Sequence, residues 1–251
     1  MNRGNISIAM SVLAVVACLL KLFLYLNQTP QVEFHTTEAG GYVDRGNFSA
    51  RTGQYEQALE DYDQAIRLDP KEAVAYYDRG NAYYALGQAK RALEDYDQAI
   101  RLDPKDADSY LQRGAVYDDL GEYKRAIEDY DQAIRLAPGD PKAYNNRGIT
   151  YSNLKQYKRS LEDFDQAIGI DPTRADIYYN RAGTYADLGQ YERAVQDYDR
   201  AIQLDPNNAD FYADRGTAYR KLKQFDRARQ DFEHAKSLSK AGDSPPEESR
   251  K

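Results

Sequence analysis

The chain has 251 residues, with 41 acidic and 34 basic side chains and a formal net charge of −7. This acidic balance argues against a nucleic-acid-binding protein, because such proteins present a basic face. The single cysteine excludes an intramolecular disulfide, and His35 and His234 lie too far apart in the sequence to indicate a metal site.

Residues 1–26 are expected to form a membrane segment. Within them, residues 6–26 are predominantly apolar and carry a single charge, Lys21. A helix of that length would span about 30 Å, the thickness of the hydrocarbon core of a bilayer. Three interpretations remain open: a retained single-pass anchor, a signal acylated at Cys18, where the sequence VVAC resembles a bacterial lipobox, and an ordinary cleaved signal peptide.

The charges at the N-terminus predict the orientation of such an anchor. Arg3 and the terminal amine favour a cytoplasmic N-terminus, while Lys21 partly opposes it. We therefore expect the rest of the chain to be extracytoplasmic, which means periplasmic in a bacterium. A reversed anchor would leave it in the cytoplasm, and lipid attachment at Cys18 is the alternative to a retained helix. Residues 27–38 are polar and predict a linker.

Residues 39–242 consist of a 34-residue pattern that recurs six times without a gap, which is typical of a solenoid. The copies are 39–72, 73–106, 107–140, 141–174, 175–208 and 209–242. The nine residues that follow, 243–251, offer little to bury and are expected to be disordered.

Signature positions predict two helices in each copy, whose residues we number 1 to 34. Position 4 is always tyrosine and position 27 always alanine, while position 8 is glycine in five copies and position 32 is proline in five. Positions 4, 8 and 11 share one helical stripe, and positions 20, 24 and 27 share another. Glycine at position 15 suits the end of the first helix, and Lys155 and Lys223 replace it in two copies, where we expect a tighter or strained turn.

This pattern resembles the tetratricopeptide repeat, and the chain resembles membrane-anchored bacterial members of that family. The resemblance implies an all-α fold, namely a right-handed superhelical α-solenoid of six helix-turn-helix repeats, here preceded by a transmembrane or signal helix. It also implies a non-catalytic scaffold that binds protein partners on a concave face lined by the first helices.

In this family the concave face uses positions 2, 5, 6, 9, 12 and 13. The predicted partner-binding residues at these positions are Asp44, Tyr77, Asp78, Asn81, Tyr84, Asp118, Asn145, Asn146, Tyr179, Asn180 and Asp214. Further acids at the same positions are Asp108, Asp119, Asp187 and Asp210. Such a face favours neutral or basic extended segments, and the alternative is that the acidity only keeps the surface soluble. The Lys and Arg clamp with which some members bind a C-terminal carboxylate is not found at matching positions.

A second pattern predicts a ladder of ion pairs. Position 7 is arginine and position 23 is aspartate in every copy, and a guanidinium matches a carboxylate in two parallel hydrogen bonds. We expect Arg–Asp pairs within a repeat or between neighbours, with ligand binding by the arginines as the alternative. The residues are Arg45, Arg79, Arg113, Arg147, Arg181 and Arg215, with Asp61, Asp95, Asp129, Asp163, Asp197 and Asp231.

The remaining motifs predict neither catalysis nor a cofactor. The recurrent run Glu-Asp-Tyr-Asp is interpreted as a solvated helix face, and there is no phosphate loop, nucleophile elbow or metal-ligand spacing. We therefore predict no enzyme, metal or small-molecule substrate. The alternative function is that of a lipoprotein subunit or regulator of an envelope protease or cell-wall complex. In the last copy, Arg229 and Lys236 replace apolar residues, which predicts a polar cap at the end of the array.

Overall fold

The computed structural model describes residues 38–242, which form twelve α-helices and no strand. The helices are α2 (Glu38–Arg51), α3 (Tyr55–Leu68), α4 (Ala73–Ala85), α5 (Ala89–Leu102), α6 (Ala107–Asp119), α7 (Tyr123–Leu136), α8 (Pro141–Asn153), α9 (Tyr157–Ile170), α10 (Ala175–Asp187), α11 (Tyr191–Leu204), α12 (Ala209–Lys221) and α13 (Phe225–Gly242). The expected membrane segment 1–26, the linker up to residue 37 and the tail 243–251 lie outside the described residues. Within residues 38–242, no helix is both long and apolar enough to cross a bilayer.

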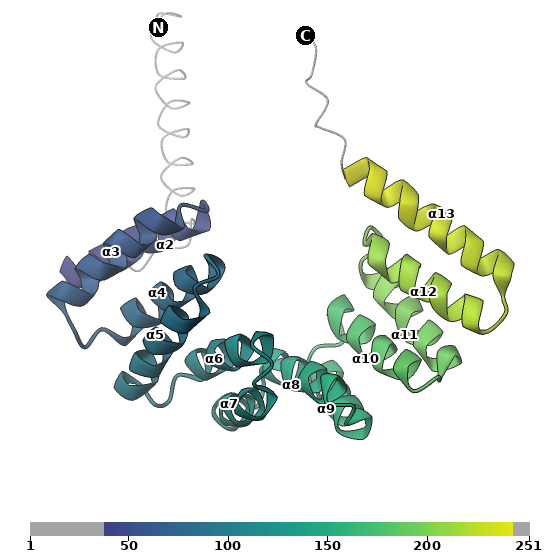
Figure 1. Cartoon of the computed structure of the whole chain (residues 1–251), viewed down its shortest axis with the longest axis horizontal. Coiled ribbons are helices and arrows are strands. Elements are labelled where there is room, and N and C mark those ends of the chain that lie inside the picture. Colours follow the sequence, from purple (N-terminus) through teal and green to yellow (C-terminus); the bar gives the residue numbers. More distant parts are fainter. Residues whose placement is uncertain (1–37, 243–251) are drawn as a thin grey trace, which may run out of the picture.

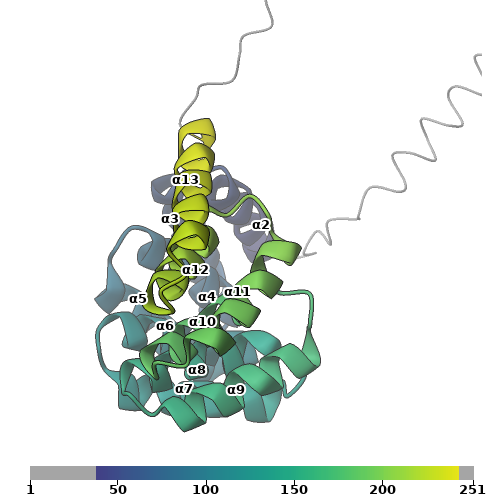
Figure 2. The ribbon, with the colours of Figure 1, turned by 90° about the vertical axis from the view of Figure 1, so that its right-hand side faces the viewer.

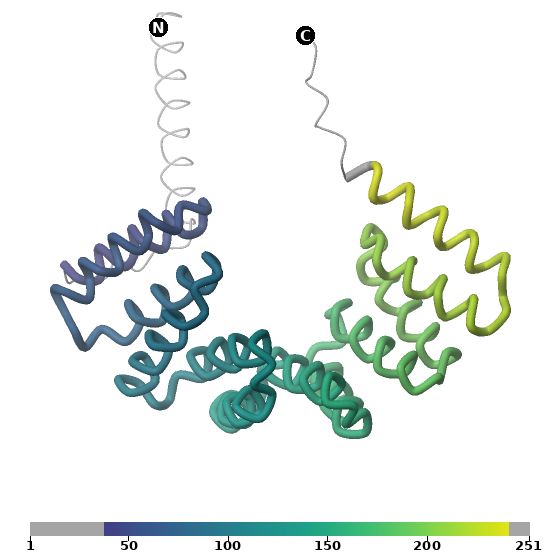
Figure 3. Tube along the Cα trace, in the orientation of Figure 1, coloured from purple at the N-terminus to yellow at the C-terminus, as the bar shows by residue number. Residues whose placement is uncertain are grey.

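The helix pairs follow one another around an open arc. Figure 1 shows α2 and α3 at one end and α12 and α13 at the other, with α4, α6 and α8 on the inner side of α5, α7 and α9. The trace in Figure 3 advances around this arc in one direction. After a quarter turn, both ends lie on the same side of the molecule, opposite α7, α8 and α9 (Figure 2). The array therefore has an inner face built from first helices.

Each helix pair closes around a small residue at position 8. In the second copy, a Cβ atom added to Gly80 on α4 would lie 2.8 Å from Cε1 of Tyr96 on α5, a distance that side chains do not tolerate. The Tyr96 ring is fully buried against this glycine. Glycine costs helix stability, but here it lets an aromatic ring fill the space between the two helices.

Stacking of the copies buries the rest of each apolar surface. Position 10 of one copy lies among the apolar residues of the preceding copy: Val116 packs with Ala92 and Tyr96, and Ala218 packs with Ala194 and Tyr198. One helix pair could not shelter these residues by itself, so the stability of the array depends on its interfaces as well as on its repeats.

The turn inside each repeat has the same geometry whether or not it contains glycine. The residue at position 15 has a positive φ, which is 71° at Gly87 and 57° at Lys155. The amide that follows bonds back to the helix over the same distance in both copies, 2.8 Å from Gln88 N to Tyr83 O and from Gln156 N to Tyr151 O. The expected tighter turn is therefore wrong, and the lysine has a left-handed backbone that disfavours any residue with a Cβ atom.

Replacing Lys155 with glycine should therefore raise the free energy of unfolding by about 1 kcal/mol. Relief of the left-handed strain outweighs the extra entropy that glycine gives the unfolded chain. The change is read from the urea midpoint followed by circular dichroism. The reverse substitution, Gly121→Lys, is the matched control and should lower the midpoint. A midpoint unchanged by both substitutions would contradict the strain.

Candidate protein-binding surface

Hydrogen bonds between successive first helices connect several of the residues predicted to bind partners. The Tyr84 hydroxyl on α4 donates to Asp119 on α6, and the Tyr179 hydroxyl on α10 donates to Asp214 on α12 over 2.7 Å. Asn180 Nδ2 donates to Asn145 Oδ1 over 3.0 Å. These side chains are therefore not simply displayed toward a partner, because they also hold neighbouring repeats together on the inner face.

Burial makes two tyrosines of this inner face weaker acids than a free tyrosine. It raises the pKa of Tyr84 to about 12, and the hydrogen bond to Asp119 adds to the effect. The pKa of Tyr179 is also raised, first by burial and then by its bond to Asp214. Both hydroxyls are therefore neutral donors near pH 7, and they leave the negative charge of the face on its carboxylates.

The second half of the array contains a hollow on the inner face. A cavity of about 200 Å³ opens between α8, α10 and α12. Its residues are Ile149, Ser152, Asn153, Phe164, Tyr179, Asn180, Gly183, Thr184, Asp187, Tyr198 and Asp214. Four of these, Tyr179, Asn180, Asp187 and Asp214, are residues that the sequence analysis named.

The floor and sides of this inner cavity differ in polarity. Phe164 and Tyr198 from the second helices are buried and give it an aromatic floor. Thr184 is hydrogen-bonded to Ser152 over 3.2 Å on its wall, and Asp187 is exposed at its rim. An apolar side chain would fit the floor, and a cation beside it would meet the carboxylate of Asp187.

Gly183 leaves the cavity open. It lies at position 9, where the first two copies have asparagine, and a Cβ atom added to it would meet nothing within 4 Å. In the second copy, Asn81 accepts a hydrogen bond from the Tyr96 hydroxyl over 2.7 Å, so the side chain at position 9 covers the ring. The cavity exists because this cover is missing above Tyr198.

A second hollow of about 390 Å³ lies in the first half of the array. Its lining includes Tyr77 and Asp78 on α4 and the acidic residues Asp103, Asp106 and Asp108 around the start of α6. Of the other predicted binding residues, Asp118 accepts a hydrogen bond from Thr150 over 2.5 Å, and Asn146 accepts one from Asn145 over 3.3 Å.

Asp44 lies half-buried on α2. It lines neither hollow. The structure therefore distributes the predicted residues between two hollows and the bonds that join repeats.

The repeated arginines bridge copies. Arg113 donates from Nε and Nη2 to Asp129 of its own copy, over 2.8 and 2.6 Å, and from Nη1 to Asp97 of the preceding copy over 2.6 Å. Burial lowers the pKa of Arg113, but the two carboxylates outweigh it and the pKa is raised. Five copies share this arrangement, whereas Arg45 has no preceding copy and its side chain is 60% exposed.

The second carboxylate of each bridge was missed by the sequence analysis. It lies at position 25, within the Glu-Asp-Tyr-Asp run interpreted as a solvated face, and the residues are Asp63, Asp97, Asp131, Asp165 and Asp199. Its recurrence in five copies was a signal, but only the stacking shows that it reaches the next arginine. In the part of the chain that the structure describes, no group of His, Cys, Asp or Glu side chains could hold a metal ion.

Comparison with known proteins relates nearly all of the described array to one repeat family. A TPR repeat model matches residues 46–87, 80–121 and 184–223, and two further tetratricopeptide-repeat models match residues 114–182 and 209–241. A comparison with curated protein sequences gives no match.

Solved structures show the same fold. The structure of YrrB, described as a TPR protein with an unusual peptide-binding site, is 30% identical, with 66% of this chain and 85% of YrrB covered and a TM-score of 0.55. PilF of Pseudomonas aeruginosa is 21% identical over 80% of this chain and 91% of its own, with a TM-score of 0.71. MamA of Desulfovibrio magneticus RS-1 is 22% identical over 68% and 98%, with a TM-score of 0.62. At these lower identities, PilF and MamA support the fold alone.

Proposed function

The chain belongs to the tetratricopeptide-repeat family, and from this premise we propose that it is a non-catalytic scaffold that binds an extended segment of a protein partner on its inner face. The observation that supports this most is the cavity between α8, α10 and α12. It combines an aromatic floor with amide and hydroxyl groups and an acidic rim. The peptide-binding site named for YrrB supports the same class of ligand.

The chemistry of the cavity defines the segment it would accept. An apolar side chain would lie on Phe164 and Tyr198, while Asn180 would exchange hydrogen bonds with the backbone of the segment. A lysine or arginine next to the apolar residue would pair with Asp187. The proposed ligand is therefore neutral or basic, and its affinity should fall as salt screens the carboxylates.

Replacing Gly183 with tyrosine should block this site without unfolding the array. The new side chain would enter open space and fill the cavity, so we expect peptides selected on the unmodified full-length chain to bind at least about tenfold more weakly, as expected when a contact at the centre of an interface is lost. The affinities are measured by fluorescence anisotropy with basic and acidic peptides of equal length.

Gly183→Ala is the matched control. It removes a helical glycine and should raise the free energy of unfolding by about 1 kcal/mol. It should also preserve binding, because a methyl group leaves most of the cavity empty. If Gly183→Tyr binds the selected peptides as well as Gly183→Ala does, the cavity is not the binding site. If acidic peptides bind better than basic ones, the proposed ligand chemistry is wrong.

We also propose that residues 1–26 tether the scaffold to a membrane with the repeats on the extracytoplasmic side. The support is the apolar run 6–26 and the charge of Arg3. Mass analysis of the membrane-extracted protein tests this, since an intact N-terminus gives Met1 and a lipoprotein gives an acylated Cys18. A chain recovered from the soluble fraction would contradict tethering.

The sequence VVAC at residues 15–18 supports a second candidate function. In this alternative the chain is a lipoprotein that acts as an accessory subunit or regulator of an envelope protease or cell-wall complex. Cross-linking in the native membrane, followed by identification of the attached protein, distinguishes the two. An envelope enzyme attached to a chain acylated at Cys18 would favour this second candidate.

A further inference from the structure

The two ends of the array expose the two most solvent-accessible large apolar side chains of the described residues. Phe48 on α2 is 69% exposed and Phe225 on α13 is 65% exposed. Both are exposed because an array of repeats has a first and a last copy, so each lies where a neighbouring repeat would otherwise cover it.

Phe48 lies at a position that is buried in every other copy. Position 10 is 2% exposed or less in the second to sixth copies, where the residues are Ala82, Val116, Thr150, Thr184 and Ala218. Its neighbours in the preceding copy include positions 20 and 24, as Val116 shows with Ala92 and Tyr96. A side chain at position 10 of the first copy is therefore placed to pack on positions 20 and 24 of another repeat.

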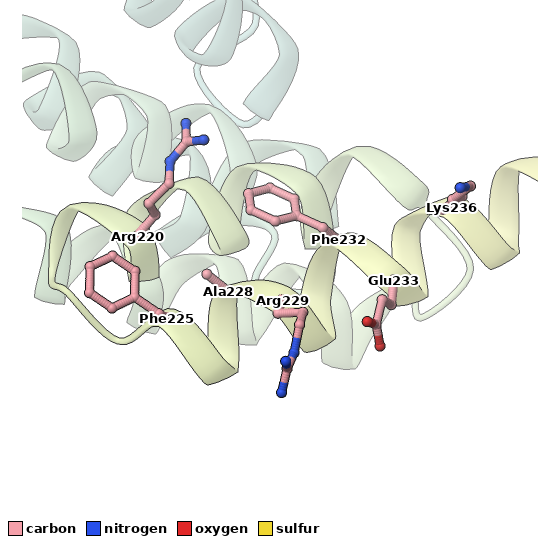
Figure 4. A pocket seen from close by; sticks show the side chains of 7 residues that line it. All are labelled: Arg220, Phe225, Ala228, Arg229, Phe232, Glu233 and Lys236. Carbon is pink, nitrogen blue, oxygen red and sulfur yellow. The ribbon is translucent and has the colours of Figure 1, made fainter.

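The last copy offers these positions as an open apolar cavity. A hollow of about 380 Å³ is lined by Phe225, Ala228 and Phe232, at positions 17, 20 and 24. Figure 4 shows the two phenylalanine rings on either side of Ala228, with Arg220 above them on α12 and Lys236 further along α13. The polar cap predicted from Arg229 and Lys236 is therefore incomplete, because these cations stand beside an apolar surface and do not cover it.

The ladder of ion pairs is also incomplete at both ends in complementary ways. In the other five copies, Nη1 of the arginine donates to position 25 of the preceding repeat. Arg45 has Asp61 of its own copy but no preceding repeat, and position 25 of the last copy is Glu233, which lines the terminal cavity. A second molecule stacked on the last repeat would bring Arg45 to Glu233.

The other charges at the two ends of the array are also opposite in sign. The terminal cavity is edged by Arg220, Arg229 and Lys236, whereas the first turn of α2 carries the exposed Glu38. Opposite charges on two such patches attract and orient them. Gly41, at position 3 of the first copy, has nothing within 4 Å of an added Cβ atom and leaves room for the stem of a long cation.

We propose that this protein associates head to tail with a second copy of itself, so that α2 of one molecule docks on α12 and α13 of the next. Phe48 enters the cavity beside Phe225, and Arg45 pairs with Glu233. The two surfaces differ, so the contact is heterologous, and it continues into a chain of molecules unless the rotation closes a ring. It leaves the inner face free for a partner.

Photo-cross-linking of the full-length chain in a mild detergent tests this contact. Phe48 is replaced by the photoreactive p-benzoylphenylalanine, and cross-linked peptides are mapped by mass spectrometry. We expect dimers and higher multimers joined to peptides containing residues 225–236. The same probe at Phe225 should map to residues 38–48, and the probe at Leu188, an exposed residue within the array, should give no such product.

Single aspartates then test the chemistry. Phe48→Asp and Phe225→Asp should each weaken self-association at least about tenfold in sedimentation velocity, with unchanged circular dichroism because both side chains are exposed. Mixing the two variants should restore a dimer but no longer chain, since the intact first copy of Phe225→Asp docks on the intact last copy of Phe48→Asp and leaves only substituted ends. Three results would each overturn the proposal. They are cross-links between two first copies, cross-links to residues 1–37 of the same molecule, and a protein that stays monomeric with every probe.

Discussion

Replacing Arg113 with alanine should lower the free energy of unfolding by about 3 kcal/mol, whereas the same replacement at Arg45 should lower it by a smaller amount. The Arg113 side chain is 18% exposed and that of Asp129 is 7% exposed, so the substitution leaves a buried carboxylate without its cation. Arg45 is mostly exposed and bridges no preceding repeat, so its loss leaves one carboxylate, Asp61, without a cation, whereas the loss of Arg113 leaves both Asp129 and Asp97. Urea unfolding of the two variants gives the comparison.

A double-mutant cycle separates the pair from its surroundings. Asp129→Ala leaves Arg113 with Asp97, so it should cost less than Arg113→Ala. The free energy of unfolding lost in the double variant should be smaller than the sum of the two single losses, by about 1 kcal/mol or more. If the losses simply add, Arg113 and Asp129 do not interact. A loss at Arg45 as large as that at Arg113 would show that bridging between copies is unimportant.

Replacing Tyr96 with alanine should lower the free energy of unfolding by about 3–5 kcal/mol, because the ring is fully buried between two repeats. The cavity cannot collapse readily, since Gly80 on the facing helix has no side chain to move into it. The loss is measured by urea unfolding, and a broadened transition would show that the second and third copies no longer unfold together with the rest.

Tyr96→Phe is the matched control. It keeps the ring but removes the donor to Asn81, so it should cost about 1 kcal/mol. In the fourth copy the corresponding ring is Phe164 and position 9 is Ile149, so that copy combines the two changes. Tyr96→Phe with Asn81→Ile should therefore recover much of the loss. A Tyr96→Phe variant as unstable as Tyr96→Ala would show that the hydroxyl matters more than the packed ring.

The arginine ladder separates what the sequence indicates from what it leaves open. The pairing of positions 7 and 23 could be inferred because both residues recur and both lie in one helix pair. The second carboxylate at position 25 could not, because its partner belongs to the next copy, and the angle between copies depends on side-chain packing over the whole interface. The same limit applies to Asp214, whose position on the inner face was predicted but whose bond to Tyr179 was not.

The sequence by itself determined the six helix pairs of this protein, because a period repeated six times places the same small and aromatic residues on the same helical stripes each time. Only the tertiary structure decided where the surface is open. Gly183 frames a cavity because the rings of α9 and α11 lie beneath it, and Phe48 and Phe225 are exposed because stacking stops at the first and last copies. Local periodicity specifies each unit, but the fit between units decides which side chains remain accessible to another molecule.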